Sequence, residues 1–377
     1  MRLVAVLCAA SGVAACDVIL GIDHDYRQGD AALDVVGGGE AGDGGPSDAG
    51  TCSFAVNPVV EQLALLDGSF GIASDDSSIY VTDMAGNRVL KCPLVDGGCK
   101  TQITWTAPSF APTLLMFEGP TYVGWTDQNP DAASHRLRKV ERDWDGSTSI
   151  DTQSNPYSEV SSMLYSFLNG TAPSGSDGVI FWTDPNIKNV AQYYVTGAPP
   201  QGNYSLFVNG ENDARALAGD DSDVYWLVTG VNSSNQSDIH TCAAKYYPLD
   251  TYDGGCTPTT VIDHLTGQPL IAVRNNVLYW VEGNGVRSCN PKACVLNNLA
   301  DVQSVPGAIA VDDCALYWTD LGDNSVKRCA LPDCSGGPTR IASNQNNPRA
   351  IALDSTRVYW STSTGDASTG GIWSVPK

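Results

Sequence analysis

A five-residue aromatic phrase recurs along the chain, and its repetition constrains the fold more than any other feature. Its fullest form is LYWTD, which a polar turn and a further apolar run follow. The phrases begin between 38 and 57 residues apart along the sequence. They are IYVTD 79–83, VGWTD 123–127, IFWTD 180–184, VYWLV 224–228, LYWVE 278–282, LYWTD 316–320 and VYWST 358–362. A repeat of about forty to fifty residues that carries four short strands is typical of a β-propeller blade.

The segments around each phrase supply the other strands of a blade. Upstream lie runs of small and β-branched residues that end in an Asp or Asn turn, and these suit an innermost strand. They occupy 71–76, 216–221, 270–276, 308–313 and 350–355. The phrase itself is then the second strand. Third strands are expected at 87–92, 284–289 and 324–329, and TRIAS 339–343 is an example of a fourth.

The large aromatic residue of each phrase is expected to pack between neighbouring sheets. The repeat residues are Tyr80, Trp125, Trp182, Trp226, Trp280, Trp318 and Trp360. In the first phrase, Val81 occupies the position that tryptophan holds in the other six. Few charged residues (17%) and many Gly (38) and Pro (21) also favour an all-β chain of short strands joined by turns.

Closure of the ring is predicted from both ends of the repeat region. The last repeat ends at GIWSVPK 371–377 and so has three strands, whereas VVEQLALL 59–66 precedes the first inner strand. If 59–66 supplies the missing outer strand, the ring closes and no open edge remains. We therefore expect a single seven-bladed β-propeller over 52–377, with six or eight blades as the alternatives.

These phrases resemble the YWTD propeller of the low-density lipoprotein receptor family. The match is complete at 317–320, near at 181–184 and 124–127, and spreads over roughly 67–377. The resemblance implies a propeller fold, partner binding, and structural hydrogen bonds for the phrase aspartates, here Asp83, Asp127, Asp184 and Asp320. The chain departs from that family in having seven repeats where the family has six. It also loses the Thr-Asp pair at Val228, Glu282 and Thr362.

The N-terminus carries a targeting signal rather than a part of the fold. Arg2 precedes an apolar stretch that is too short to span a bilayer, so residues 1–15 are expected to be a signal peptide. Val13-Ala14-Ala15-Cys16 resembles a bacterial lipobox, which predicts a lipid on Cys16 and an anchor in the cell envelope, periplasmic or surface-facing. The alternative is an ordinary signal peptide that is cleaved after Ala15 without lipidation.

Residues 16–51 are predicted to be a disordered tether. The segment is rich in Gly, Asp and Ala and has almost no aromatic residue, so it cannot bury enough apolar surface to offset its ordering entropy. Its acids contribute to a net charge of −21 and a pI near 4.3 for the whole chain. Such an acidic chain disfavours a nucleic-acid partner.

Twelve cysteines indicate an exported, disulfide-bonded protein. Cys8 lies in the signal and Cys16 is the lipid site. In four repeats a cysteine follows the third-strand apolar residue by three positions, and a second one comes soon after. The expected pairs are Cys92–Cys99, Cys242–Cys256, Cys289–Cys294 and Cys329–Cys334, with Cys52–Cys314 assigned by elimination. Zinc binding is the competing interpretation, but the spacing fits a four-ligand site poorly and no histidines accompany it.

No catalytic motif stands out among the remaining residues. The histidines His24, His135, His240 and His264 are scattered. Acid pairs at 75–76, 220–221 and 312–313 follow inner strands, and they are either turn residues or a site for a cation or a basic partner. Asp143 and Asp145 lie in DWDG, which is either a hairpin turn or an incomplete calcium loop.

Two classes of function remain open on the sequence alone. The first is a tethered binding or scaffold module for an envelope protein, glycan or peptide, which is expected to be monomeric and without a cofactor. The second is a metal-dependent hydrolase or lactonase with ligands in the central channel, for which Glu61, Glu118 and Glu282 are candidates. The longest irregular stretches, 128–143, 186–205 and 229–256, are the expected place for a binding surface.

Overall fold

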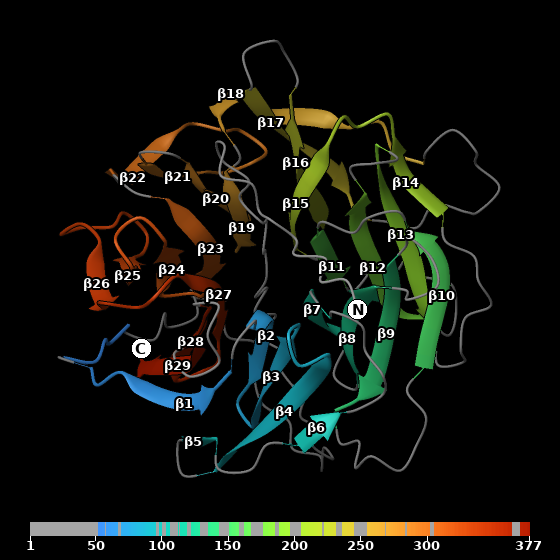
Figure 1. The fold of residues 1–377 in the computed structure, drawn as a ribbon. Coiled ribbons are helices and arrows are strands. Elements are labelled where there is room, and N and C mark those ends of the chain that lie inside the picture. Colours follow the sequence, from blue (N-terminus) through green and yellow to red (C-terminus); the bar gives the residue numbers. More distant parts are fainter. Residues whose placement is uncertain are drawn as a thin grey trace, which may run out of the picture.

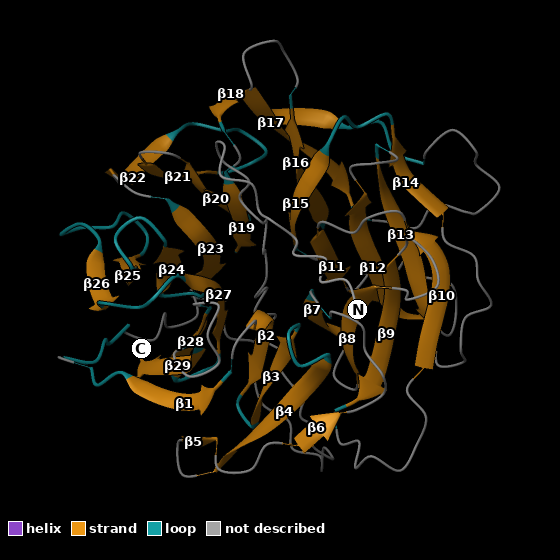
Figure 2. Cartoon of the chain, viewed as in Figure 1, coloured by secondary structure: helices purple, strands orange, loops and turns teal. Residues whose placement is uncertain are grey.

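The computed structural model describes most of the repeat region and none of residues 1–51. The described residues are 52–56, 58–66, 69–95, 98–99, 103–105, 112, 114–118, 122–128, 135–142, 151–157, 162–166, 176–184, 188–196, 205–220, 222–230, 236–244, 255–267, 269–282, 285–301, 305–363 and 370–377. Every regular element in this part is a strand (Figure 2). No helix among these residues is long and apolar enough to cross a membrane. The expected signal peptide and tether, Cys16, and Asp143 with Asp145 lie outside the described residues.

The described strands form seven antiparallel sheets, one for each aromatic phrase. The first sheet contains β2 Ser69–Asp75, β3 Ser78–Asp83, β4 Arg88–Val95, β5 Gly98–Cys99 and β6 Ile103–Trp105. The second contains β7 Leu115–Glu118, β8 Tyr122–Gln128, β9 His135–Glu141 and β10 Asp151–Tyr157. The third contains β11 Ser162–Ser166, β12 Ser176–Asp184, β13 Asn189–Thr196 and β14 Ser205–Asn209. Each phrase lies on the second strand of its sheet, as the repeat predicts.

The remaining four sheets follow the same order. The fourth contains β15 Ala214–Gly219, β16 Asp223–Thr229, β17 Gln236–Ala243 and β18 Thr259–Thr266, and the fifth contains β19 Leu270–Arg274, β20 Val277–Glu282, β21 Gly285–Cys289 and β22 Asn297–Asp301. The sixth contains β23 Pro306–Val311, β24 Ala315–Asp320, β25 Ser325–Ala330 and β26 Thr339–Ala342. The seventh contains β27 Pro348–Leu353, β28 Arg357–Thr362, β29 Gly371–Pro376 and β1 Glu61–Leu65. We call these sheets blades 1 to 7 in the order of their inner strands.

The inner strands close a ring. Each of β2, β7, β11, β15, β19, β23 and β27 contacts the inner strand of the next blade, and β27 contacts β2. Figure 1 shows the blades arranged around one central axis. The inner strands carry small residues because they crowd that axis, and Ala216, Ala308 and Ala350 are buried there. The fold is therefore an all-β propeller.

The two ends of the described chain close the ring together, as predicted. β1 pairs with β29 in blade 7, and Glu61 lies opposite Ser374. The guanidinium of Arg357 bonds the carboxylate of Glu61 at 2.7 Å, and the amide of Ala55 donates to the carbonyl of Lys377 at 2.7 Å. Gly371 makes this pairing possible, because a Cβ there would lie 2.4 Å from the carbonyl oxygen of Ala64.

The phrase tryptophans lie on the blade face that meets the preceding blade. Trp226 of blade 4 packs with Val179 and Phe181 of blade 3, and Trp360 of blade 7 packs with Ala308 and Tyr317 of blade 6. The indole and the neighbouring sheet bury each other, as the repeat led us to expect.

One sequence expectation needs correction. The stretches 128–143, 186–205 and 229–256 are not irregular throughout, because they contain the third strands β9, β13 and β17. The polar, weakly periodic sequence of these long strands hid them. What is left of the three stretches lies largely outside the described residues.

Candidate functional site: the two mouths of the propeller

The first acid of each acidic turn caps that turn. We call the surface formed by the turns between inner and second strands the inner-turn face. There, Asp75, Asp220, Asp312 and Asp354 each accept hydrogen bonds from the backbone amides two and three residues later, at 2.7 to 2.9 Å. Asp side chains mimic a backbone turn in this way. These carboxylates therefore serve local structure.

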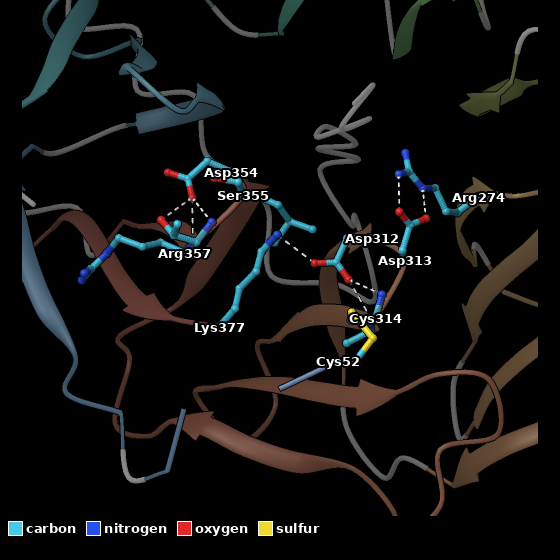
Figure 3. Close-up of polar contacts among 12 residues, drawn as sticks. Cys52, Arg274, Asp312, Asp313, Cys314, Asp354, Ser355, Arg357 and Lys377 are labelled. Atoms are coloured by element: carbon cyan, nitrogen blue, oxygen red, sulfur yellow. Dashed lines mark hydrogen bonds and ion pairs between the residues drawn. A yellow bond between two sulfur atoms is a disulfide. The ribbon is translucent and has the colours of Figure 1, made fainter. Parts of the chain in front are cut away.

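The second acid of a turn reaches back to the preceding blade. Asp313 of blade 6 accepts bonds from the Arg274 guanidinium of blade 5 at 2.8 and 3.0 Å and from the Asn275 amide at 2.8 Å. Asp76 of blade 1 accepts from the amide of Ser355 in blade 7 at 2.8 Å. Figure 3 shows the Asp313–Arg274 contact beside Asp312. The sequence could not reveal these contacts, because their partners lie 39 and 279 residues away.

Two of the turn-capping acids of this face also pair with cations. The Lys377 ammonium lies 2.8 Å from a carboxylate oxygen of Asp312, and the Arg142 guanidinium lies 3.4 Å from that of Asp75 (Figure 3 for the first pair). Of the two interpretations of the acid pairs, the described geometry supports turn chemistry rather than a cation site. Asp221 lies outside the described residues.

The phrase aspartates are buried at the far ends of the second strands, and three of them form ion pairs. Asp83 bonds the Arg88 guanidinium at 2.7 Å, Asp127 bonds that of Arg138 at 3.2 Å, and Asp320 bonds the Lys327 ammonium at 2.5 Å. Asp184 is equally buried. The partners come from third strands, so each pair ties the end of a second strand to its neighbour. For Asp83, Asp127 and Asp320, this is the structural role that the family resemblance implied.

Asp323 extends the blade 6 pair into a small charge network. Burial alone would raise the pKa of this carboxyl, but hydrogen bonds from Ser325, Lys327 and Arg340 outweigh burial and lower the pKa below its usual value. The Lys327 and Arg340 nitrogens lie 2.9 and 2.6 Å from the same carboxylate oxygen. Asp323 is therefore held as an anion between two cations.

The glutamates considered as channel ligands lie on three different blades. Glu61 lies on the outermost strand of blade 7, paired with Arg357, which removes it from the channel. Glu282 ends β20 and accepts a bond from the Thr266 amide at 3.3 Å, and Glu118 ends β7. Within the part of the chain that the structure describes, no group of three or more His, Cys, Asp or Glu residues is placed to hold a metal ion.

One buried acid–histidine pair was not anticipated from the sequence. Glu211 precedes β15, is 5% exposed, and places its carboxylate oxygens 3.0 and 3.2 Å from Nδ1 of His240 on β17. His240 lies opposite Trp226, a position that Arg138, Arg287 and Lys327 hold in other blades. That alignment of third strands is the signal that could have found it. Because Val228 replaces the phrase aspartate in blade 4, the carboxylate comes from the preceding loop instead.

Of the other histidines, His264 has a described side chain. His264 is exposed and lies 3.8 Å from Asp263, and His135 begins β9. His24 lies outside the described residues.

Disulfides join the expected cysteines. Cys242–Cys256, Cys289–Cys294 and Cys329–Cys334 bridge the third strand and the loop before the fourth, and Cys52–Cys314 ties the N-terminal segment to the turn between β23 and β24 (Figure 3). Cys92 is also disulfide-bonded, and its expected partner Cys99 lies on the adjacent β5. The Cys92–Cys99 pairing itself stays a prediction.

The phrase tyrosines are buried beside the acidic turns. Burial raises the pKa of Tyr80, Tyr225, Tyr279, Tyr317 and Tyr359 above the ordinary value. For Tyr359, a hydrogen bond to Asp354 adds to the effect of burial. These hydroxyls are therefore protonated at neutral pH and unsuited to act as bases there.

Comparison with known proteins supports the propeller fold but not a particular function. No protein-family model and no curated protein matches the chain. Among solved structures, virginiamycin B lyase from Staphylococcus aureus superposes with a TM-score of 0.58 at 16% identity, over 85% of this chain and 99% of that one.

Two further structures align less closely. The nidogen/laminin complex gives a TM-score of 0.49 at 16% identity, over 71% of this chain and 94% of that one. Aldose sugar dehydrogenase from Streptomyces coelicolor gives 0.47 at 11%, over 86% and 99%. At such identities a likeness shows a shared fold alone, and propellers serve both as binding modules and as enzymes.

Proposed function

We propose that this chain is a binding or scaffold module of a bacterial cell envelope, held to a membrane through a lipid on Cys16. The observation that carries the proposal is that the acidic residues described at both faces of the ring already bind turn amides or cations of the ring itself. Asp75, Asp312, Asp313 and Asp320 all serve turns or pair with cations of the same ring. Such a ring is a rigid support rather than a constellation of reactive groups.

The anchoring of the N-terminal segment supports the same role. Cys52–Cys314, the Ala55–Lys377 hydrogen bond, and the Phe54 ring 3.8 Å from the Arg328 guanidinium fix where the segment meets the ring. A tether then has a defined point of attachment. The resemblance of the phrases to the low-density lipoprotein receptor propeller also favours partner binding, and an envelope protein, a glycan or a peptide is the proposed class of partner.

The anchor is tested by replacing Cys16. In a bacterial host, wild-type chain is expected to incorporate labelled fatty acid and to sediment with membranes, whereas Cys16→Ala is expected to do neither. Cys8→Ala is the matched control, because it removes a cysteine of the signal segment without touching the lipobox. Equal labelling of wild type and Cys16→Ala would overturn the lipid-anchored proposal.

Metal analysis separates the binding module from a metal-dependent hydrolase or lactonase. The purified chain is desalted and its divalent metals are measured against protein concentration. A binding module is expected to carry less than stoichiometric metal and to unfold at the same temperature with and without chelator. One tightly held divalent ion per chain, with hydrolysis of a lactone that the chelator abolishes, would replace this proposal with the enzymatic one.

A further inference from the structure

Residues 52–56, which we call the strap, fasten the chain to blade 6 before it enters β1. Cys52 is bridged to Cys314 in the turn between β23 and β24. The amide of Ala55 donates to the carbonyl of Lys377 at 2.7 Å. The chain that precedes the strap therefore joins the ring at the acidic turn of blade 6, and not at β1 of blade 7.

The bridge of the strap is the most accessible of the described disulfides. Cys52 is exposed, whereas the cysteines of the other three described bridges are buried or half-buried. Their third-strand members Cys242, Cys289 and Cys329 are at most 4% exposed. A thiolate must reach a sulfur atom to exchange with it, so access decides which bridge is reduced first. A dithiol reductant therefore attacks at Cys52 before it opens the third-strand bridges.

The phrase tyrosines of blades 1 and 7 donate to the acid that caps the neighbouring turn. The Tyr80 hydroxyl lies 3.5 Å from Oδ2 of Asp75, and the Tyr359 hydroxyl bonds Oδ2 of Asp354. In both blades Oδ1 of the same acid caps the turn. A tyrosine bonded to the second oxygen is thus an arrangement that this repeat adopts.

Blade 6 departs from that arrangement, although it has the same two side chains. Oδ1 of Asp312 caps the turn, but Oδ2 lies 2.8 Å from the Lys377 ammonium (Figure 3). The Tyr317 hydroxyl is buried and has no hydrogen-bond partner among the described residues. Burial and, after it, the Asp312 carboxylate raise the pKa of Tyr317, so the two groups are close enough to interact. Lys377, which the strap holds through Ala55, takes the place of Tyr317.

The strap also lies against a second incompletely bonded donor. The Phe54 ring is 3.8 Å from the Arg328 guanidinium of β25, and Nη1 of Arg328 is buried with no hydrogen-bond partner in the described part of the chain. A buried donor without an acceptor costs free energy, and ordering the strap costs conformational entropy. The bridge at Cys52 is therefore what keeps the strap in place.

We propose that the strap is a redox-controlled device: reduction of Cys52–Cys314 releases residues 52–56 from blade 6, and Asp312 then exchanges Lys377 for Tyr317. The reductant is a dithiol. One of its thiolates attacks Sγ of Cys52 and expels the Cys314 thiolate. Its second thiolate attacks the mixed disulfide and frees Cys52, so that two electrons and two protons pass to the cysteines and the dithiol becomes a disulfide.

Release moves the point at which the preceding chain joins the ring. β1 stays paired with β29, and Glu61 stays bonded to Arg357, so the ring remains closed. The preceding chain is then attached at β1 of blade 7 and no longer at the turn of blade 6. The ring gains freedom to reorient relative to whatever holds that chain, and this holds whether or not Cys16 carries a lipid.

The first experiment treats the oxidised full chain with dithiothreitol under native conditions and alkylates the free thiols at intervals. Mass spectrometry is expected to find Cys52 and Cys314 labelled at least about tenfold faster than Cys289 and Cys329. Hydrogen exchange of the Ala55 amide should then accelerate about tenfold or more, while the amides of β1 stay protected. Equal labelling of all bridges, an Ala55 amide that stays protected, or joint loss of protection in β1 would overturn the proposal.

The second experiment tests the exchange at Asp312 by thermal unfolding. Tyr317→Phe should not destabilise the oxidised chain, but it should lower the unfolding temperature by about 2 °C when Cys52 and Cys314 are both replaced by serine. Tyr359→Phe is the matched control, because its partner Asp354 is the same in both backgrounds and its effect should be too.

A further variant keeps the test decisive if the serine variant does not fold. Lys377→Met in the oxidised chain frees Oδ2 of Asp312 while the bridge stays intact, so Tyr317→Phe should become destabilising there as well. An effect of Tyr317→Phe that is the same with and without Lys377 would show that the two groups do not compete for Asp312.

Discussion

Asp313 holds Arg274 of the neighbouring blade through two hydrogen bonds, while Asp312 beside it caps its own turn. Adjacent acids thus perform different tasks. The side chain of Asp313 is 53% exposed and that of Asp312 is 14% exposed. The difference in burial decides which of the two contributes more to stability.

We expect Asp312→Ala to lower the free energy of unfolding by about 2 kcal/mol, because two backbone amides and Lys377 lose their partner. Asp313→Ala should cost less than about 1 kcal/mol, since its ion pair is exposed to solvent and screened by salt. Urea unfolding of both variants at low and high salt checks the order. An Asp313→Ala protein that is the less stable of the two would contradict it.

The charge network of Asp323 predicts a loss of stability in acid. The pKa of Asp323 is lowered in the folded protein, so its contribution is present above the unfolded pKa, about 3.9, and is lost as the pH falls through the folded pKa. Asp323→Asn should therefore be less stable than wild type at pH 7 and equal to it at low pH, as judged by urea unfolding. Asp301→Asn, at an exposed acid, should change little at either pH. A deficit that persists unchanged in acid would be inconsistent with this account.

Two phrase tyrosines should respond oppositely to loss of the hydroxyl. The Tyr359 hydroxyl donates to Asp354, whereas that of Tyr317 is buried without a hydrogen-bond partner among the described residues. Tyr359→Phe should cost about 1 kcal/mol, and Tyr317→Phe should be neutral or stabilising by a similar amount, because it removes a buried unsatisfied group. Thermal unfolding distinguishes the two, and equal destabilisation would count against the assignment.

The disulfides should differ in their effect on stability. Cys52 and Cys314 are 262 residues apart, whereas Cys329 and Cys334 are 5 apart. On the chain-entropy model the long bridge contributes about 5.5 kcal/mol and the short one about 2 kcal/mol. Replacing the first pair by alanine should lower the unfolding temperature more than replacing the second. The reverse order would mean that local strain or residual structure dominates.

Gly371 should be sensitive even to alanine. The added Cβ would collide with the backbone of Ala64, and backbone atoms cannot move aside without breaking the β1–β29 pairing. We expect Gly371→Ala to be less stable by about 1 to 3 kcal/mol and to expose residues 59–66 to proteases under native conditions. Unchanged proteolysis of 59–66 would show that β1 accommodates the change.

The sequence predicted the ring because the ring is a consequence of local pattern. The recurring aromatic phrases, the small residues of the inner strands and the extra strand at 59–66 all reflect which residues are buried. Burial imposes the same pattern on each repeat. The cysteine pairs of blades 4, 5 and 6 followed from equivalent positions in their repeats, and Cys52–Cys314 followed by elimination. None of these inferences required knowledge of which side chains meet between blades.

The uses of the polar residues could not be predicted in the same way. Arg274, Arg142 and Lys377 neutralise acids of other segments, and only the three-dimensional ring brings these charges together. The role of Glu211 depends on Val228, which replaces the phrase aspartate in the same blade.

The position of Cys52 ahead of β1 has a mechanical consequence. A pulling force transmitted along the chain from residue 51 reaches the covalent bond to Cys314 before it reaches the strand pair β1–β29. The load therefore passes directly into blade 6, and the hydrogen bonds of the closing strand carry none of it while the disulfide is intact. If the chain is pulled from its N-terminal side, the strand pair β1–β29 that closes the ring therefore stays unloaded.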